Sequence, residues 1–204
     1  MLYGSACGAL EIRRLSTGAT SLRGSFPYNR TAILSDGGKS GRPRKERFAS
    51  NAFNYSVLDP TRDIHLLVGH DYAKPLASKL TRSLTLKDSK EALTFDATIA
   101  PEVVETSYGQ NAIALLTVGL AVGLLPGFRI PPVRAVQDAE TITQEEVDPE
   151  NDMHGAIIRT VNEAILYELS IVTSPAYEDA TVELRSWSPS PVIKPQPVLA
   201  RWRL

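Results

Sequence analysis

The chain has few cysteines and histidines and no long uninterrupted apolar run. Cys7 is the only cysteine among 204 residues, so an internal disulfide is excluded. This cysteine and the three histidines show neither C-x-x-C nor H-E-x-x-H spacing, which predicts no zinc site. The most apolar stretch, 113–126, is too short and too often interrupted to span a bilayer. We therefore expect one domain with no structural metal, no disulfide and no contact with a membrane.

Other absences narrow the function classes further. No glycine-rich phosphate loop and no dinucleotide fingerprint occurs, so no cofactor is predicted. The first residues carry no basic region ahead of an apolar stretch, so we expect no signal peptide and a cytoplasmic location.

Charges of opposite sign nearly cancel, but they are segregated along the chain. Lys and Arg number 22 and Asp and Glu 23, yet residues 1–48 hold nine basic and three acidic side chains, and 134–155 hold one and seven. The basic segment 35–46 is broken by Gly and Pro and lacks interleaved aromatics, which favours a solvated loop over a nucleic-acid contact. The acidic segment 134–155 lacks a calcium-loop pattern and is also predicted to be a solvated loop.

Alternating and β-branched segments predict a mostly β domain, in one compact sheet or barrel with one main helix. Strands are predicted at 9–15, 22–34 and 64–71, a hairpin at 82–99, extended chain at 118–132, and two strands joined at Asn162-Glu163. The main helix is predicted at 102–118, although Gly109 disfavours it. Within 64–70, alternation places His70 at the end of the apolar row and His65 on the opposite face. His65 and His154 are predicted to be surface residues.

Six segments, in this order and at these spacings, resemble the tailed-phage prohead protease family: GSFPYNRTAIL, KERFASNAFNYSV, LLVGHDYAKPLA, LTLKDSKEALTFDATI, GLAVGLLPGF and ILYELSIVTSPAYEDATV. The resemblance covers about residues 9–184. It leaves 1–8 as an N-terminal extension and 185–204 as a basic tail, in which proline predicts polyproline II.

This resemblance implies a mostly β (α+β) fold similar to herpesvirus assemblin, a small closed or partly closed β-barrel surrounded by a few helices. It implies a serine endopeptidase that cuts scaffold and capsid proteins. Those proteins are the expected partners, together with other copies of the chain, inside an assembling prohead or virion in the host cytoplasm.

Peptide hydrolysis by a hydroxyl requires a base, a group that orients the base, and backbone donors for the oxyanion. His70, in Gly-His-Asp, stands where the resemblance places the catalytic histidine; the alternative is a packed histidine that caps a strand end. Glu168, in L-Y-E-L-S, matches an acidic position and could orient His70; the alternative is an ordinary glutamate paired with arginine. Pro126, Gly127 and Phe128 stand at the expected oxyanion and substrate turn, where glycine permits the required backbone geometry.

The nucleophile position departs from the family pattern. Members resemble G-x-x-x-G-x-S-P/F-G-F, whereas this chain has Leu125 at the serine position within 119–128. Leucine offers neither a proton nor a lone pair, so the chain as written lacks the nucleophile. The nearest other hydroxyls, Ser107, Tyr108 and Thr117, fall in the predicted helix, and Ser170 and Ser174 are expected to be packing or hydrogen-bonding residues.

Two hypotheses remain open. The chain is a maturation protease in a Ser→Leu form, engineered or natural. Alternatively, it is a protease-fold protein without catalysis that acts as a structural or assembly component through its basic N-terminal segment and its tail.

Overall fold

The computed structural model describes residues 2–3, 10–38, 41–121, 123–148, 150 and 153–173 and is mostly β, with 48% strand and 13% helix. The predictions for Cys7, Ser174 and the tail 185–204 lie outside these residues. The strands are β1 (Leu2–Tyr3), β2 (Leu10–Arg14), β3 (Thr20–Pro27), β4 (Ala32–Ser35), β5 (Arg44–Phe48), β6 (His65–Val68), β7 (Asp71–Ser78), β8 (Leu84–Asp88), β9 (Ala92–Ile99), β10 (Gly123–Arg129), β11 (Glu140–Gln144), β12 (Val147–Asp148), β13 (Met153–His154), β14 (Ile157–Val161) and β15 (Ile165–Val172). The helices are α1 (Asn54–Leu58), α2 (Pro101–Val104) and α3 (Ser107–Thr117).

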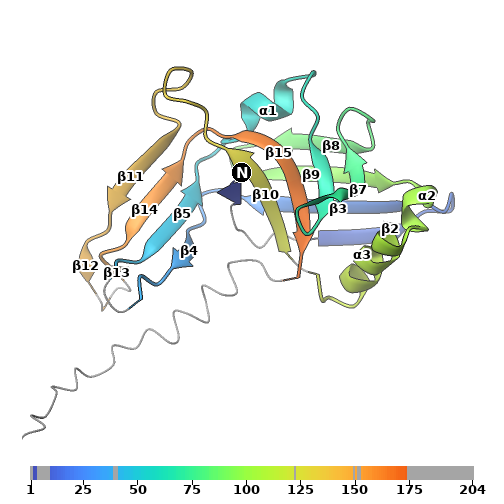
Figure 1. Cartoon of the computed structure of the whole chain (residues 1–204), viewed down its shortest axis with the longest axis horizontal. Coiled ribbons are helices and arrows are strands. Elements are labelled where there is room, and N and C mark those ends of the chain that lie inside the picture. The colour runs from blue at the N-terminus through green and yellow to red at the C-terminus, as the bar shows by residue number, and fades with distance from the viewer. Residues whose placement is uncertain are drawn as a thin grey trace, which may run out of the picture.

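Two sheets face each other and a third extends from them (Figure 1). The front sheet has the strand order β1-β10-β15-β6-β7, and the back sheet has the order β2-β3-β9-β8. The side sheet, β11-β14-β5-β4, projects away from this pair, and β12 and β13 form a small ribbon. The expected single sheet is therefore several sheets. The closed or partly closed barrel stays a prediction.

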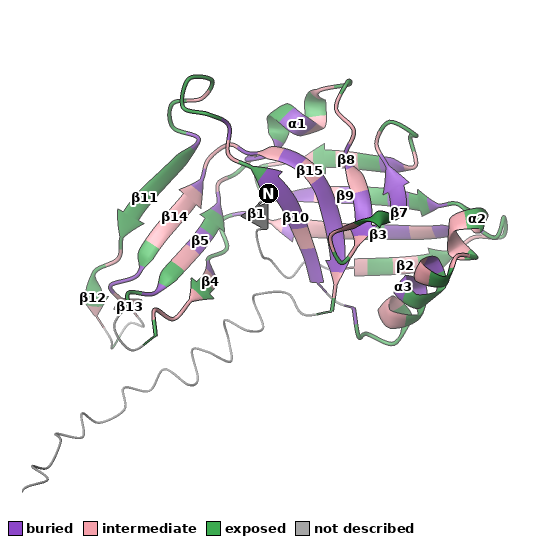
Figure 2. Cartoon of the chain, in the orientation of Figure 1, coloured by how far each residue is buried: buried purple, intermediate pink, exposed green. Residues whose placement is uncertain are grey.

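The hydrophobic core lies between the front and back sheets (Figure 2). Leu22 and Phe95 of the back sheet and Leu66 and Leu169 of the front sheet are almost completely buried. Where the side sheet joins, an aromatic cluster packs mostly edge to face; its members are Phe26, Tyr28, Phe48, Phe53 and Phe128. Burial of such rings contributes to the hydrophobic driving force for folding, and their packing holds the junction between the sheets together.

The chain passes from the side sheet to the front sheet twice, and the two crossings run next to each other. β5 leads through α1 into β6, and β14 leads through a short link into β15. Both resulting pairs, β5 with β14 and β6 with β15, are parallel. The link is secured by buried hydrogen bonds, one of them from the Leu166 N–H to Ser56 Oγ at 2.9 Å. This double crossing is what places β15 beside β6.

Several predicted elements are confirmed. The hairpin at 82–99 forms β8 and β9, and the two runs joined at Asn162-Glu163 form β14 and β15. The alternation of apolar and polar residues predicted the hairpin correctly because its two strands are neighbours in sequence and pair with each other. It predicted β14 and β15 because these strands are rich in apolar residues.

Other boundaries were wrong. The strand predicted over 22–34 is broken after β3, where Asn29 takes a φ of 57°. The segment 35–46 is not all loop, because β5 begins at Arg44. The segment 134–155 is not simply a solvated loop either. It contains β11, whose exposed side chains concealed the strand pattern and whose backbone pairs with β14.

The helix predicted over 102–118 is two helices. α2 ends at Val104, and Thr106 caps α3 by accepting a hydrogen bond from the Gly109 N–H at 3.1 Å. A Cβ built on Gly109 would lie 2.0 Å from the Val103 carbonyl oxygen, so the tight bend between the helices requires glycine. Among the described residues, no helix is long and apolar enough to cross a membrane.

We expect Gly109→Ala to lower the free energy of unfolding by about 1–3 kcal/mol, because the added methyl group must displace the α2 backbone. In an ordinary helix interior the same change would stabilise. Chemical denaturation checks this, with the exposed α3 substitution Asn111→Ala as the control, for which a change within about 0.5 kcal/mol is expected. A stabilising Gly109→Ala would contradict the role of glycine at the bend.

Candidate active site

His70 lies in a two-residue turn between β6 and β7. Val68 pairs with Asp71 across this turn, and Gly69 and His70 have φ values of 62° and 61°. Two positive φ angles are typical of a type I′ hairpin turn, whose twist matches that of the strands. The prediction that His70 ends the apolar row of the strand was therefore wrong: the strand stops at Val68. The histidine side chain is 20% exposed.

Glu168 is the partner of this histidine. It lies in β15, the neighbour of β6, and its side chain is fully buried. His70 Nδ1 is 2.8 Å from Glu168 Oε1. The alternative considered from the sequence was that Glu168 pairs with an arginine, and the partner found here is a histidine instead. The structure therefore brings together two of the residues that the sequence singled out, although they are 98 positions apart.

Ser170 holds the same pair from the other side. Its Oγ donates to Glu168 Oε2 at 2.7 Å and accepts from the His70 backbone N–H at 2.9 Å. The serine is completely buried. Its predicted hydrogen-bonding role is confirmed, but no sequence pattern indicated that it joins the His70 turn to Glu168. The only available signal was its spacing, two residues after Glu168, which puts both side chains on one face of a strand.

Leu125 and Gly127 lie on the strand next to Glu168. In the antiparallel pairing of β10 with β15, Leu125 is opposite Ser170 and Gly127 is opposite Glu168. Residues directly opposite share a sheet face, so Leu125 lies on the face that carries the Glu168 and Ser170 side chains. A Cβ on Gly127 would lie 2.1 Å from Glu168 Oε1. The glycine therefore provides the space through which the glutamate reaches across β10.

Phe128 faces the opposite way, into the core. It is fully buried, and its ring contacts Phe48 and Phe53. The strand register shifts between Gly127 and Phe128, which marks a β-bulge. Bulges redirect the backbone, often beside functional sites. The predicted turn 126–128 is thus an irregular strand segment, anchored on one face by an aromatic ring and adjoining the glutamate on the other.

Comparison with known proteins identifies the family. The sequence profile of the caudovirus prohead serine proteases matches residues 35–193. The chain belongs to this family. No match was found among curated proteins or among solved structures. Family membership sets the chain in the context of capsid and scaffold proteins within an assembling phage capsid.

A serine protease needs a serine nucleophile, and three of the other hydroxyl groups near the predicted nucleophile position or on the glutamate strand form hydrogen bonds within the structure. Tyr108 and Thr117 lie in α3 as predicted, and their hydroxyls donate to the backbone carbonyls of Pro75 and Ile113. Ser107 is at the exposed start of the same helix. The Ser170 hydroxyl donates a hydrogen bond to Glu168 Oε2. The assignment of Leu125 to the nucleophile position remains what the sequence resemblance predicts.

Other ionisable side chains, both beside the His70–Glu168 pair and in the side sheet, form hydrogen bonds or ion pairs. Asp71, next to His70, accepts from the Ala73 N–H and pairs with Lys74, and these contacts hold its pKa below the usual range. Glu46, in the side sheet, has its pKa raised by burial despite its ion pair with Arg159. His65 and His154 are half-buried, and His65 Nε2 lies 3.4 Å from an Asp63 carboxylate oxygen. Within the described part of the chain, no cluster of three or more potential ligands could hold a metal ion.

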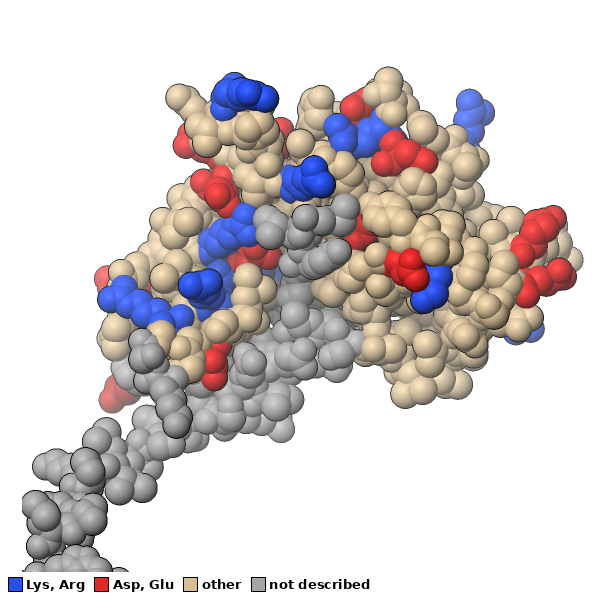
Figure 3. Space-filling model, viewed as in Figure 1, with Lys and Arg blue, Asp and Glu red and all other residues tan. Residues whose placement is uncertain are grey.

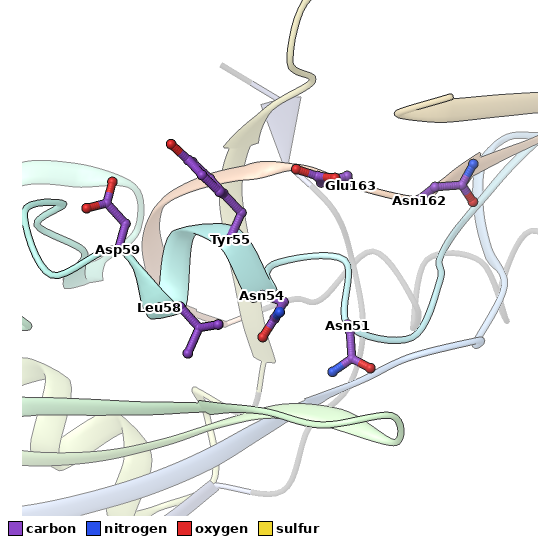
Figure 4. Close-up of a pocket in the computed structure, with 7 residues that line it drawn as sticks. All are labelled: Asn51, Asn54, Tyr55, Leu58, Asp59, Asn162 and Glu163. Carbon is purple, nitrogen blue, oxygen red and sulfur yellow. The ribbon is translucent and has the colours of Figure 1, made fainter. Parts of the chain in front are cut away.

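The molecule also contains a pocket of about 650 Å³ away from this pair, between α1 and the link from β14 to β15 (Figure 4). Its polar lining comes mainly from asparagine and carboxylate side chains, including Asn54, Asp59 and Asn162. None of the residues proposed from the sequence lines it. The pocket therefore does not alter the assignment of the candidate active site to the front sheet.

We expect Ser170→Ala to destabilise the protein by about 1–3 kcal/mol, because Glu168 Oε2 and the His70 N–H both lose a buried partner. The amide of His70 should also exchange faster with solvent, a local effect that hydrogen–deuterium exchange by NMR detects. Ser16→Ala, at an exposed turn, is the control and should leave both measurements unchanged. An unaltered His70 amide in Ser170→Ala would show that the bridge does not hold the turn.

Proposed function

We propose that this chain has the fold and the base–acid pair of a prohead endopeptidase but does not cleave peptides as written. In this proposal His70 is the general base, Glu168 orients it, and Leu125 occupies the place of the nucleophilic serine. Backbone N–H groups around Pro126, Gly127 and Phe128 would face the oxyanion. Substrates would be polypeptide segments of scaffold and capsid proteins.

The supporting observation is the 2.8 Å contact between His70 Nδ1 and Glu168 Oε1, with Leu125 opposite Ser170 on the next strand. An ionised carboxylate only accepts hydrogen bonds, so this contact requires the hydrogen on Nδ1 and leaves Nε2 with a lone pair in the neutral ring. A histidine held in that form can take a proton from a hydroxyl.

Burial of Glu168 suits the orienting role. When the base takes a proton, it becomes a cation beside a carboxylate that water does not screen, and this stabilises the protonated ring. The second carboxylate oxygen accepts a hydrogen bond from Ser170. Because both oxygens are then bonded, the carboxylate is held in one orientation. With a serine at position 125, these residues would supply the base, the orienting group and the backbone donors.

The second candidate function is a structural one. A half-buried leucine at the nucleophile position would make the same face a nonpolar contact surface. A chain of this kind would remain with the particle as an assembly component. Finding it in stoichiometric amounts in purified mature particles would favour this function, because a maturation protease digests itself and leaves.

Leu125→Ser tests the proposal. We expect the unchanged chain to leave its scaffold or capsid substrate intact and the serine variant to cleave it. Loss of a serine nucleophile costs on the order of 10⁶ in turnover, so the contrast should be all or none in a gel assay. The matched control is Leu125→Ala, which removes the leucine side chain without adding a hydroxyl and should remain inactive.

The histidine is tested on the active background. Adding His70→Ala to Leu125→Ser should abolish cleavage, and adding Glu168→Gln should reduce it by several orders of magnitude, since the ring loses the carboxylate that orients it. Cleavage by the unchanged chain would overturn the assignment of position 125. Full activity of the His70→Ala double variant would overturn the assignment of the base.

A further inference from the structure

Tyr167 is the extra residue of the bulge between β10 and β15. The register of the two strands pairs Gly127 with Glu168 and then Phe128 with Leu166. Tyr167, between the two β15 residues, is left without a partner in this ladder. The extra residue of a bulge departs from the regular alternation, and its side chain is re-aimed. The contacts of the Tyr167 ring therefore show where this side chain lies, directly beside the glutamate of the candidate active site.

The Tyr167 ring contacts two guanidinium groups. Cζ of Arg62, from the segment ahead of β6, lies 5.7 Å from the ring centroid, and Cζ of Arg129, at the end of β10, lies 5.4 Å from it. Both distances are within the range of a cation–π interaction. We call Arg62, Arg129 and Tyr167 the arginine–tyrosine cluster. Because like charges repel, two cations beside one ring favour the approach of an anion.

The protein supplies little of that negative charge. Arg62 Nε is 3.8 Å from an Asp59 carboxylate oxygen, which is too long for a hydrogen bond. This buried nitrogen has no hydrogen-bond partner among the described residues. In the same part of the chain, the exposed Arg129 guanidinium forms neither an ion pair nor a hydrogen bond. The two arginines therefore retain positive charge and N–H donors for a ligand.

Other basic side chains lie on the same side of the molecule. Figure 3 shows Lys and Arg side chains over the side sheet, with acidic ones beside them, and also around the end of β10 near α1. In the side sheet, Lys45 is paired with Glu145 at 2.7 Å. Arg159 is paired with Glu46 at 3.0 Å. The arginine–tyrosine cluster differs from these pairs because one ring orients two guanidinium groups.

The arginine–tyrosine cluster lies on the same face of the front sheet as the candidate active site. Alternate residues of a strand share a face, so Leu125, Gly127 and Arg129 lie on one side of β10. Phe128 points to the other side, into the core. At about 3.4 Å per residue, Arg129 is about 14 Å along the strand from Leu125. An extended polypeptide on this face spans that distance in about four residues.

We propose that the arginine–tyrosine cluster binds the carboxylate of an acidic side chain in a polypeptide whose peptide bond lies beside position 125. This inference rests on the proposed function, because that polypeptide is the substrate. A guanidinium presents a planar fork of N–H donors that matches the two oxygens of a carboxylate. The ring orients both guanidinium groups before binding, which reduces the entropy lost on association. The site thus selects substrates with Glu or Asp within about four residues of the bond beside position 125.

Peptide binding to the full chain tests this inference without cleavage. The probes are three pools of fluorescent decapeptides that have Glu, Gln or Lys at one fixed central position and random residues elsewhere. Gln has the shape of Glu without its charge. The test variants are Arg129→Gln, Arg129→Glu and Arg62→Gln. The matched controls are Arg13→Gln and Arg13→Glu, which change an exposed arginine of β2 in the back sheet.

We expect the unchanged chain to bind the Glu pool about tenfold more tightly than the Gln pool, as one charge-assisted hydrogen bond would produce. Arg129→Gln should abolish this preference and Arg62→Gln should reduce it. Arg129→Glu should reverse it in favour of the Lys pool. Both Arg13 variants should behave like the unchanged chain, because their charge change is on the other sheet.

Equal binding of the Glu and Gln pools by the unchanged chain would overturn the inference, and so would an unaltered preference in Arg129→Glu. Complete displacement of the Glu pool by an equal concentration of inorganic phosphate would also contradict it, because the site would then accept any anion. All of these chains retain Leu125, so an inactive Leu125→Ser variant would count against the proposed function only.

Discussion

A fully buried carboxylate organises the candidate site. Moving an ionised glutamate out of water is costly unless both of its oxygens find hydrogen-bond partners. Here Oε1 meets His70 and Oε2 accepts from Ser170. Each partner lies in a different structural setting, one in a turn and one on the same strand. The requirement to satisfy Glu168 therefore fixes the position of the β6–β7 turn relative to β15.

The fold around Glu168 makes this arrangement possible. The double crossing from the side sheet puts β6 and β15 side by side and parallel, so the end of β6 lies beside Ser170. On the other side, Gly127 lets the glutamate extend across β10, and the bulge that follows is anchored by Phe128 in the aromatic cluster. Packing of the core thus sets the alignment of three strands that each contribute to one site.

The candidate site lies near one edge of the front sheet. β10 is the strand next to the acid and, apart from two residues of β1, its outer side has no strand partner among the described residues. Position 125 therefore lies on a strand between the glutamate strand β15 and the outermost strand of the front sheet.

Local patterns in the sequence predicted the parts whose causes are local. The hairpin at 82–99 follows from alternation around a charged turn, and the location of Glu168 on a strand follows from its apolar neighbours. They did not predict the break at Glu105 and Thr106, because the apolar spacing continues across it and the bend depends on how closely Gly109 approaches the Val103 carbonyl. They missed β11 because an exposed strand lacks an apolar face. Its partner β14 is joined to it by the backbone ladder and by an ion pair between Glu140 and Arg159, and neither contact leaves an apolar pattern in the sequence.

By itself, the sequence determined which residue types are present: a histidine in Gly-His-Asp, an acid two residues before Ser170, and a leucine at position 125, where the proposed mechanism needs a hydroxyl. Only the tertiary structure decided that His70 lies in a positive-φ turn, that Ser170 bridges it to Glu168, and that β1 lies along β10. The physical reason is that these contacts join strands distant in sequence. Their geometry depends on how the sheets pack and on which backbone groups remain to be paired.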